Sequence, residues 1–399
     1  MAAPYYALYL WQQRLNKELS VRRSVMNWDY YHAANMLENV IDEYGSEQFL
    51  IFDLAGLYSK LDRLGDEATL YQELETQNAN FPGLADAVQR NNLKRRPQVH
   101  FTYVMQKDDG WDGYKAVKQE IMKGGGWYYQ SINQKWSLDL ARIDYQSTNK
   151  NLSVWAWRSM LSYDAKIFQA LSLSLAGGFE ELESGYDTTP LLYGEITWKI
   201  ADEMRAVLSV KQDVTTDTLA SLTRNIKRRD YKIKVVFDLF HRIVLGGFYD
   251  FIDYSDSNWT KNSNFWASYI FLPEPTLFKI SYNYDYYDSK EGKKPGPPSG
   301  DGFARDDHPY WSPQDYWITR FSFNFKHQLS GDTLARGVPS YYTIGYSLGY
   351  DSDDNDLHEF EGSLNFEVAK NYTLEASYKY IDLGVYEHHK TLLSVMYRW

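Results

Sequence analysis

The chain has 399 residues, no cysteine and a formal net charge of −11 at pH 7. Without cysteine it forms no disulfides or thiolate metal sites, and the sequence gives no support to thiol-based catalysis. The acidic balance argues against a nucleic-acid partner, which needs a basic surface.

The composition combines overall polarity with many aromatic residues. Mean hydropathy is −0.55, yet the chain carries 35 Tyr and 13 Trp, and no apolar run approaches the ~20 residues of a spanning helix. A transmembrane β-barrel accounts for both properties, because its lumen and loops are polar while aromatic residues line the two membrane interfaces. The segment Met1–Pro4 lacks the features of a signal peptide, so we expect a mature or engineered form in which Met1 replaces a removed leader.

Residues 1–95 are predicted to be all-α. Apolar residues recur at helical spacing in residues 27–37 and 49–61, and a further helix is predicted to start at Leu64. Leucines alternate with small residues between positions 54 and 71, which resembles tetratricopeptide helix pairs. An ordinary helical hairpin domain is the alternative.

A basic stretch, Lys94–Pro97, divides this region from a second one that has the pattern of β-structure throughout. The predicted domains are therefore residues 1–95 and 96–399. In the second domain, alternating segments are separated by turn residues, which predicts an antiparallel barrel of about 16 strands, an even number as in single-chain bacterial barrels. The strands are expected to start near Gln98, Gly113, Lys135, Ser153, Lys166, Leu191, Glu203, Arg229, Arg242, Thr260, Thr276, Asp315, Ser340, Leu357, Tyr372 and Tyr386.

The connections are expected to alternate in length, as the periplasmic turns and extracellular loops of outer-membrane barrels do. Tight turns are predicted at residues 164–165, 201–202, 240–241, 273–275 and 369–371. Long loops are predicted at residues 213–228 and 289–313. Two connections, residues 122–133 and 328–339, are longer than a periplasmic turn should be. The last segment, Thr391–Trp399, ends on an aromatic residue, which is typical of such barrels.

Each predicted strand has one apolar and one polar face, because side chains alternate across a strand. Phe321 and Phe323 point one way while Arg320 and Lys326 point the other. A Lys or Arg at the lipid midplane costs ~2–4 kcal/mol, so the charged faces must line a water-filled lumen, with basic residues mainly in the middle strands and acidic ones in the last strands. The assigned pore-lining residues are Lys232, Lys234, Asp238, Asp285, Arg320, Lys326, Glu359, Glu361 and Glu375.

Three clusters suggest other chemistry. The acidic loop Asp351–Asp356 could bind calcium, although it lacks the glycine and glutamate of an EF-hand loop; a solvated loop is the alternative. The segment Glu387–His389 could bind a transition metal or be a chance surface group. Glu359 and Glu361 could act as a glycosidase acid and base, but two residues on one strand form no enclosed site, and lumen lining is the preferred interpretation. We therefore expect no catalytic residue, metal or cofactor.

Aromatic residues near one long loop are candidates for glycan contact. The segment Gly292–Gly300 is rich in Pro and Gly and is long enough to fold over or into the pore, or to remain exposed. Tyr310 and Trp311 follow it. Tyr and Trp rings stack on sugar faces, so an inner face that carries them could pass a neutral or weakly charged glycan. A place in the interface belt is the alternative for both residues.

The order of helical region, basic linker and about 16 strands resembles the outer-membrane exopolysaccharide export porins, the class of the cellulose, poly-N-acetylglucosamine and Pel secretion porins. The local match is to a Tyr-aromatic-Ser-Pro element of that family, written here as Tyr310, Trp311, Ser312 and Pro313, with Trp in place of Phe or Tyr. The resemblance implies a bacterial outer membrane with its lipid and lipopolysaccharide around the barrel. It also implies a periplasmic helical domain that docks synthase components. Members of the family usually carry a longer helical array.

The leading hypothesis is a passive export pore for a polysaccharide of the biofilm type, not an enzyme. A general solute porin is an alternative, although it has no obvious use for a helical domain. A barrel that assembles or translocates surface proteins or lipoproteins, with the helical domain recruiting the client, is another. A barrel that sheaths a redox partner is a fourth. Both signs of charge in the lumen leave the polymer's identity and charge open.

Overall fold

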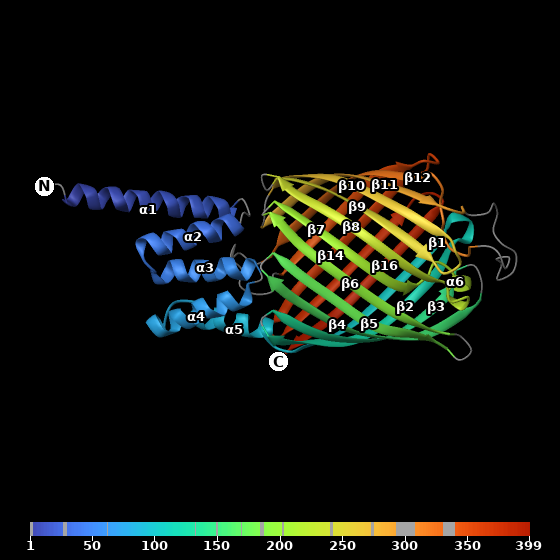
Figure 1. Cartoon of the computed structure of the whole chain (residues 1–399), viewed down its shortest axis with the longest axis horizontal. Helices are drawn as coiled ribbons and strands as arrows, with labels where there is room; N and C mark the ends of the chain where they lie inside the picture. The colour runs from blue at the N-terminus through green and yellow to red at the C-terminus, as the bar shows by residue number, and fades with distance from the viewer. Residues whose placement is uncertain are drawn as a thin grey trace.

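The computed structural model describes residues 3–26, 30–61, 63–131, 133–148, 151–168, 170–183, 187–201, 203–239, 242–272, 275–292, 308–329 and 340–399. Within them, a stack of helices precedes a closed antiparallel β-barrel (Figure 1). This confirms the predicted fold class. Among the described residues, every helix is too short or too polar to span a bilayer.

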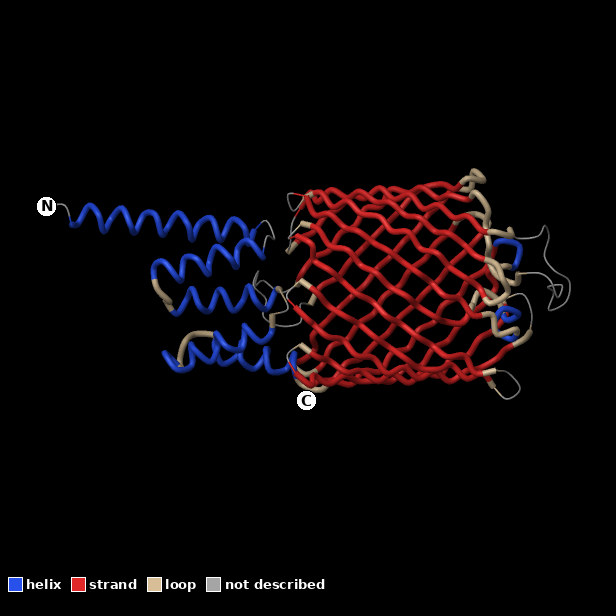
Figure 2. Tube along the Cα trace, viewed as in Figure 1, coloured by secondary structure: helices blue, strands red, loops and turns tan. Residues whose placement is uncertain are grey.

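The helical region packs as a stack in which each helix contacts the next along the chain (Figures 1 and 2). Leu37, Leu54 and Leu74 are buried between neighbouring helices, and burying one such side chain stabilises the fold by ~1.5–3 kcal/mol. Ala33 and Ala55 are fully buried, so the helices approach closely at these small residues. The helices are α1 (Ala3–Met26), α2 (Tyr30–Tyr44), α3 (Gln48–Lys60), α4 (Leu64–Asn78) and α5 (Leu84–Arg95).

The barrel begins three residues after α5 and is closed by its first and last strands. Gln98 pairs with Arg398, and the antiparallel register continues to Gly110 and Tyr386. Every other strand pairs with its neighbours in the sequence, which confirms the predicted 16 strands. Their bounds are β1 (Gln98–Gly110), β2 (Lys115–Ser131), β3 (Gln134–Ser147), β4 (Ser153–Phe168), β5 (Leu171–Leu182), β6 (Thr188–Ala201), β7 (Met204–Val214), β8 (Lys227–Leu239), β9 (Ile243–Tyr254), β10 (Trp259–Leu272), β11 (Thr276–Ser289), β12 (Tyr316–Gln328), β13 (Tyr341–Asp351), β14 (Asp356–Ala369), β15 (Tyr372–Asp382) and β16 (Tyr386–Arg398).

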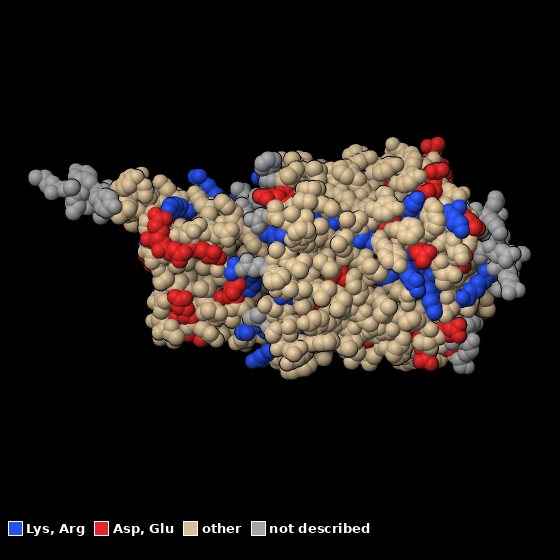
Figure 3. All heavy atoms as spheres, in the orientation of Figure 1, with Lys and Arg blue, Asp and Glu red and all other residues tan. Residues whose placement is uncertain are grey.

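The outer face of the barrel is apolar over most of its height. On β8, Tyr231, Ile233 and Phe237 are exposed, while Lys232 and Lys234 alternate with them and point inward. Figure 3 shows few charged side chains over the middle of the visible barrel wall and more toward the rim farthest from the helices. An exposed apolar band of this kind matches lipid hydrocarbon and not water.

One predicted strand boundary is wrong. Lys166 does not start a strand, and residues 164–165 form no turn: β4 continues to Phe168, and Lys166 pairs with Ser172 of β5. The error arose because charged lumen residues look like turn residues in the sequence. Asp164 instead forms an ion pair on the inner wall with Lys135 of β3, whose Nζ lies 3.0 Å from the Asp164 carboxylate.

The predicted long connection at residues 122–133 is also wrong, because β2 runs on to Ser131. Three consecutive glycines, Gly124–Gly126, suggested a break in the strand. A Cβ at Gly126 would lie 2.6 Å from the backbone oxygen of Gln98 on β1. A Cβ at Gly125 would collide with the Asp139 carboxylate, which pairs with His100 at 3.2 Å across the glycine. The glycines therefore permit close strand contact and a lumenal ion pair.

The two rims of the barrel differ. The rim beside the helices carries mainly short turns, such as residues 369–371, with the connection from Gln328 to Tyr341 as a longer one, whereas the opposite rim carries the long β7–β8 and β11–β12 connections (Figure 2). One of these, between β7 and β8, contains the short helix α6 (Leu219–Thr223). The turns predicted at residues 201–202 and 273–275 lie only partly inside the described residues. The turn predicted at 240–241, most of the 328–339 connection and most of the Gly292–Gly300 segment lie outside them.

Candidate functional site

In the half of the barrel away from the helices, the inner wall carries a chain of ion pairs that crosses several strands. Lys232 Nζ lies 2.9 Å from the Asp250 carboxylate. Arg320 of β12 lies 3.3 Å from Asp285 of β11 and 3.4 Å from Glu359 of β14. Four of the predicted lumen residues are thus drawn into charge pairs, which keeps the wall polar but leaves little net charge at this level.

The contacts of Glu359 do not fit the acid–base pair that was considered for Glu359 and Glu361. The other carboxylate oxygen of Glu359 accepts a 2.6 Å contact from Lys379, in addition to the one from Arg320. Glu361, two residues along β14, lies over Gly345 of β13, where a Cβ would come within 2.6 Å of its Oε1. The two carboxylates therefore have separate neighbours, and Glu359 serves two cations as an ion-pair partner.

The remaining predicted lumen residues lie nearer the rim beside the helices. Lys234 lies over the Trp266 ring, 5.3 Å from its centroid, and Lys326 lies over Tyr341 at 4.6 Å. Glu375 of β15 pairs in register with Asn365 of β14. The basic strands β6–β8 and the acidic strands β14–β15 are eight positions apart in the 16-strand order. The two kinds of charge therefore face one another across the lumen.

Tyr310 is fully buried at the opposite rim. Its ring stacks on Tyr254 at a centroid distance of 4.2 Å, and its hydroxyl donates to Asp256 at 2.8 Å. Burial, assisted by the Asp256 carboxylate, raises the pKa of Tyr310 well above its ordinary value. Ser312 and Pro313 are buried as well. In this arrangement Tyr310 offers no free ring face to a passing glycan.

Trp311 belongs to an aromatic cluster that packs inside the same end of the lumen. Its ring stacks on Trp111, 4.4 Å away, and Trp111 stacks in turn on Tyr386 at 4.0 Å. Tyr287 and Tyr316, which face inward from β11 and β12, contact the Trp311 ring edge-on. The interface-belt alternative is thereby excluded for Trp311, since its ring packs inside the barrel.

The loop that contains α6 reaches this cluster from the other side. Asp217 pairs with Lys115 at 2.5 Å and accepts the Trp311 backbone N–H at 3.2 Å. Thr218 Oγ1 donates to the Pro309 carbonyl at 2.5 Å. Leu222 of α6 is fully buried in a cluster formed with inward-facing apolar residues of β2–β5. We call this assembly, residues 215–226 and 308–313, the outer plug.

The helical region spans the opposite mouth from side to side. On one side, Arg90 of α5 pairs with Glu367 of β14 at 2.9 Å, and Lys370 contacts Asp86 at 2.5 Å. On the other side, Lys199 of β6 lies 3.0 Å from the centroid of the Tyr31 ring of α2. Because β6 and β14 lie opposite one another in the strand order, the stack stands along a diameter of the mouth.

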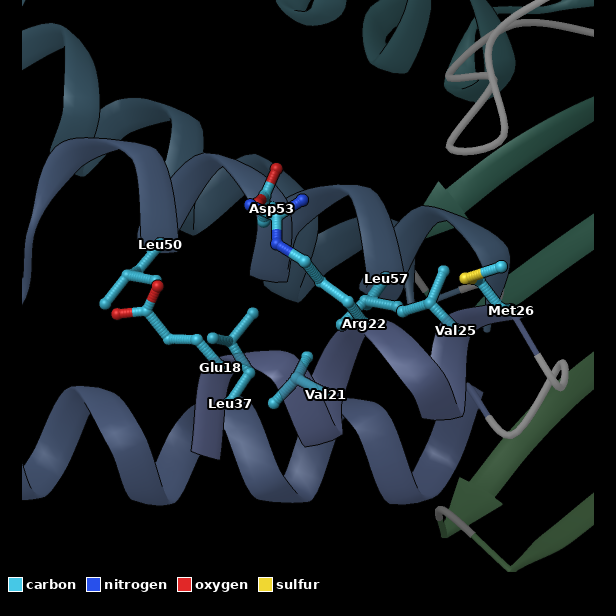
Figure 4. A pocket seen from close by; sticks show the side chains of 9 residues that line it. All are labelled: Glu18, Val21, Arg22, Val25, Met26, Leu37, Leu50, Asp53 and Leu57. Atoms are coloured by element: carbon cyan, nitrogen blue, oxygen red, sulfur yellow. The ribbon is translucent and has the colours of Figure 1, made fainter. Parts of the chain in front are cut away.

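A shallow apolar hollow lies within the helical stack itself (Figure 4). Val21 and Val25 of α1 and Leu57 of α3 line it, with Arg22 and Asp53 at its edge, 3.9 Å apart. All of its lining residues come from α1, α2 and α3, so it is not part of the pore wall.

Sequence reasoning missed the partners that complete these sites. Trp111, Asp217 and Asp256 lie in connections, where no periodic pattern marks an inward-facing residue. For Arg90 the sequence offers one weak indication of a contact with the barrel, since it is a basic residue near the end of the helical region. Its partner Glu367 belongs to the acidic face of β14 that the alternation predicts, but nothing in the sequence links the two.

No protein-family model matches the sequence, and no curated protein sequence is significantly similar to it. A solved structure titled "Bacterial polysaccharide outer membrane secretin" is similar in fold, with a TM-score of 0.58 and 10% identity over 76% of this chain and 99% of that one. Weaker similarity, at a TM-score of 0.37, 11% identity and coverage of 76% and 91%, relates it to Pseudomonas aeruginosa OccD3. The structure of Acinetobacter baumannii OccAB1 matches with a TM-score of 0.39 and 10% sequence identity, over 76% of this chain and 96% of that one. At these identities the chain shares with the first structure the fold of its barrel.

Proposed function

We propose that this chain is an outer-membrane conduit that exports a polysaccharide, with the helical region in the periplasm. The observation that carries the proposal is the pairing of a lipid-facing, polar-lined barrel with a helical stack that stands across one mouth and a plug that packs inside the other. Such a helical surface can hold synthase or polymer-modifying components beside the entrance. The polymer then passes the charged wall by transient hydrogen bonds, driven by its own synthesis.

The charge pattern of the lumen fits a hydrogen-bonding role better than ion selection. The two cations Arg320 and Lys379 are balanced by the two carboxylates Asp285 and Glu359 in the half of the lumen away from the helices. A wall of paired charges offers many donors and acceptors but a weak net field. The barrel neighbour named for polysaccharide secretion has the same fold, which supports the proposal without establishing it.

The direct test is deletion of residues 3–95 in cells that make the native polymer. We expect the truncated barrel to insert in the outer membrane, while polymer accumulates in the periplasm and is lost from the medium. Export at the native level by the barrel alone would contradict the proposed role of the helical region.

A general solute porin is the second candidate, because a barrel with a lipid-facing outer wall and a polar lumen can also pass small solutes. The outer plug argues against it, since an unregulated porin needs an open lumen. Planar-bilayer recording of the intact protein separates the two functions: steady conductance to small ions supports a porin, and rare or absent openings support a closed conduit.

A further inference from the structure

A cavity of about 480 Å³ lies at the lumen rim where the helical region meets the barrel. It falls within the ~300–1,000 Å³ range of small-molecule sites. Among the described residues that line the cavity, Tyr31 of α2 is the only one from the helical region. The charged lining residues are Lys166, Lys199, Glu203, Arg205 and Asp238.

The lining combines an aromatic ring with both donors and acceptors of hydrogen bonds. Lys199 lies against the Tyr31 ring, so one cation is already fixed beside the aromatic face. Arg205 makes no hydrogen bond or ion pair with any other described residue. Asp238 Oδ1 is buried and receives no hydrogen bond from the described part of the chain. A buried carboxylate oxygen without a donor is costly, and a hydroxyl-bearing ligand would satisfy it.

The cavity lies where a molecule would enter the lumen from the side of the helical region. On the opposite side of the mouth, the contacts of Arg90 with Glu367 and of Lys370 with Asp86 and Gln89 tie the helices to the barrel. On the cavity side, Lys199 of β6 lies over the Tyr31 ring of α2. The cavity walls include inward-facing residues of β4 to β9, so it continues directly into the lumen.

We propose that this cavity is the loading site where a short segment of a neutral or acidic glycan first binds before it enters the lumen. This inference rests on the proposed export function and extends it to a substrate class. Tyr31 stacks on a sugar face, Lys166, Lys199 and Arg205 donate to hydroxyl or carboxylate oxygens, and Asp238 accepts a hydroxyl proton. Three cations against two carboxylates, Glu203 and Asp238, disfavour a cationic polymer.

Calorimetric titration of the full chain tests this directly. The protein is kept in an amine-oxide detergent, which carries no sugar, and is titrated with three probes: cellohexaose, a galacturonic acid hexamer and a glucosamine hexamer. We expect the acidic and neutral hexamers to bind and the cationic hexamer to bind most weakly. Tyr31→Ala should weaken binding about tenfold, as loss of one ring contact implies, whereas Tyr31→Phe should retain it.

Asp238→Asn provides a second test that leaves the Tyr31–Lys199 contact in place. This substitution should weaken binding of the neutral hexamer, because an amide oxygen is a poorer hydrogen-bond acceptor than a carboxylate oxygen. Trp11→Ala, at a position 62% exposed on α1, is the matched aromatic control and should change nothing.

The proposal is overturned if no hexamer binds the native chain, if only the glucosamine hexamer binds, or if Tyr31→Ala and Asp238→Asn both bind normally. If the hexamers do not bind but cells export the polymer normally, the loading site is wrong and the export function stands. If the hexamers bind normally but export does not need the helical region, the proposed function is contradicted instead.

Discussion

Trp111 and Trp311 stack with their ring centroids 4.4 Å apart, although one lies between β1 and β2 and the other just before β12. The contact joins two connections across the outer end of the lumen. Tyr386 extends the stack to β16. The stack therefore packs side chains at the outer end of the lumen, on the path of the proposed polymer.

Trp311→Ala should open the outer plug. An aromatic pair contributes ~0.5–1.5 kcal/mol beyond the area that it buries, and Trp311 contacts several rings. We expect single-channel openings in planar bilayers to become frequent, where the native protein stays closed. Trp317→Ala is the control, because Trp317 stacks on Tyr284 and contacts Tyr350 edge-on on the outer wall. An unchanged closed level in Trp311→Ala would show that the stack does not hold the plug.

Ion selectivity of the opened channel should respond to the ion-pair chain. In a Trp311→Ala background, Arg320→Ala leaves Asp285 and Glu359 without this cation and should shift the reversal potential toward cation preference. Glu359→Gln leaves Arg320 and Lys379 in excess and should shift it toward anions.

Arg142→Ala serves as the control for these selectivity changes. Arg142 alternates with the inward-facing residues of β3 and is exposed on the outer wall. Its loss should leave the reversal potential unchanged in a salt gradient. If both lumen variants behave like Arg142→Ala, the ion-pair chain does not border the conducting path.

Docking of the helical region should weaken in acid. The hydrogen bond from Lys370, together with Arg90, lowers the pKa of Asp86. A lowered folded pKa means that this contribution is present above the ordinary Asp value of about 3.9 and is lost as the pH falls through the lowered value. Because the chain lacks cysteine, spin labels on Glu75→Cys and Asn371→Cys report the separation. We expect one narrow distance distribution at pH 5–8 and broadening near pH 3.

Asp86→Asn should broaden that distribution at every pH and remove its acid response. Asp66→Asn is the matched control, since Asp66 pairs with Arg63 inside the helical stack at 2.7 Å. A distribution that broadens equally in both variants would mean that the stack loosens as a whole, without a specific contribution from Asp86.

Glu67→Gln should stabilise the helical region at neutral pH. Glu67 is fully buried, and burial raises its pKa despite the opposing charge of Lys94. An acid with a raised folded pKa is most favourable below its unfolded value of about 4.3, and its stabilisation is lost as the pH rises through the folded value. A gain of about 1 kcal/mol would raise the melting temperature of the helical region by ~4–8 °C.

Circular dichroism at pH 7 and pH 4.5 checks this prediction, with Glu73→Gln as the exposed control on the same helix. The advantage of Glu67→Gln over the native chain should shrink at the lower pH. A lower melting temperature at pH 7 would show instead that the attraction between Glu67 and Lys94 outweighs the cost of burial.

The alternation of side chains made the barrel wall predictable, because a period of two places Lys232 and Ile233 on opposite faces wherever the strand lies. The same local rule fails where a lumen charge such as Lys166 resembles a turn residue. It also fails at Gly124–Gly126, where the need for glycine comes from a neighbouring strand. The outer plug was not predictable, since Asp217 and Trp311 meet only through folding of two distant connections.

Locking the outer plug tests the central claim most directly. Thr218 Oγ1 donates to the Pro309 carbonyl, and the chain has no native cysteine, so Thr218→Cys with Pro309→Cys places two thiols on neighbouring loops, where a disulfide would tie the loops together. In cells that make the native polymer, we expect polysaccharide in the medium to fall when the disulfide forms and to recover when a reductant is added, with neither single variant affected. Undiminished export through the fully cross-linked protein would contradict passage of the polymer through this barrel.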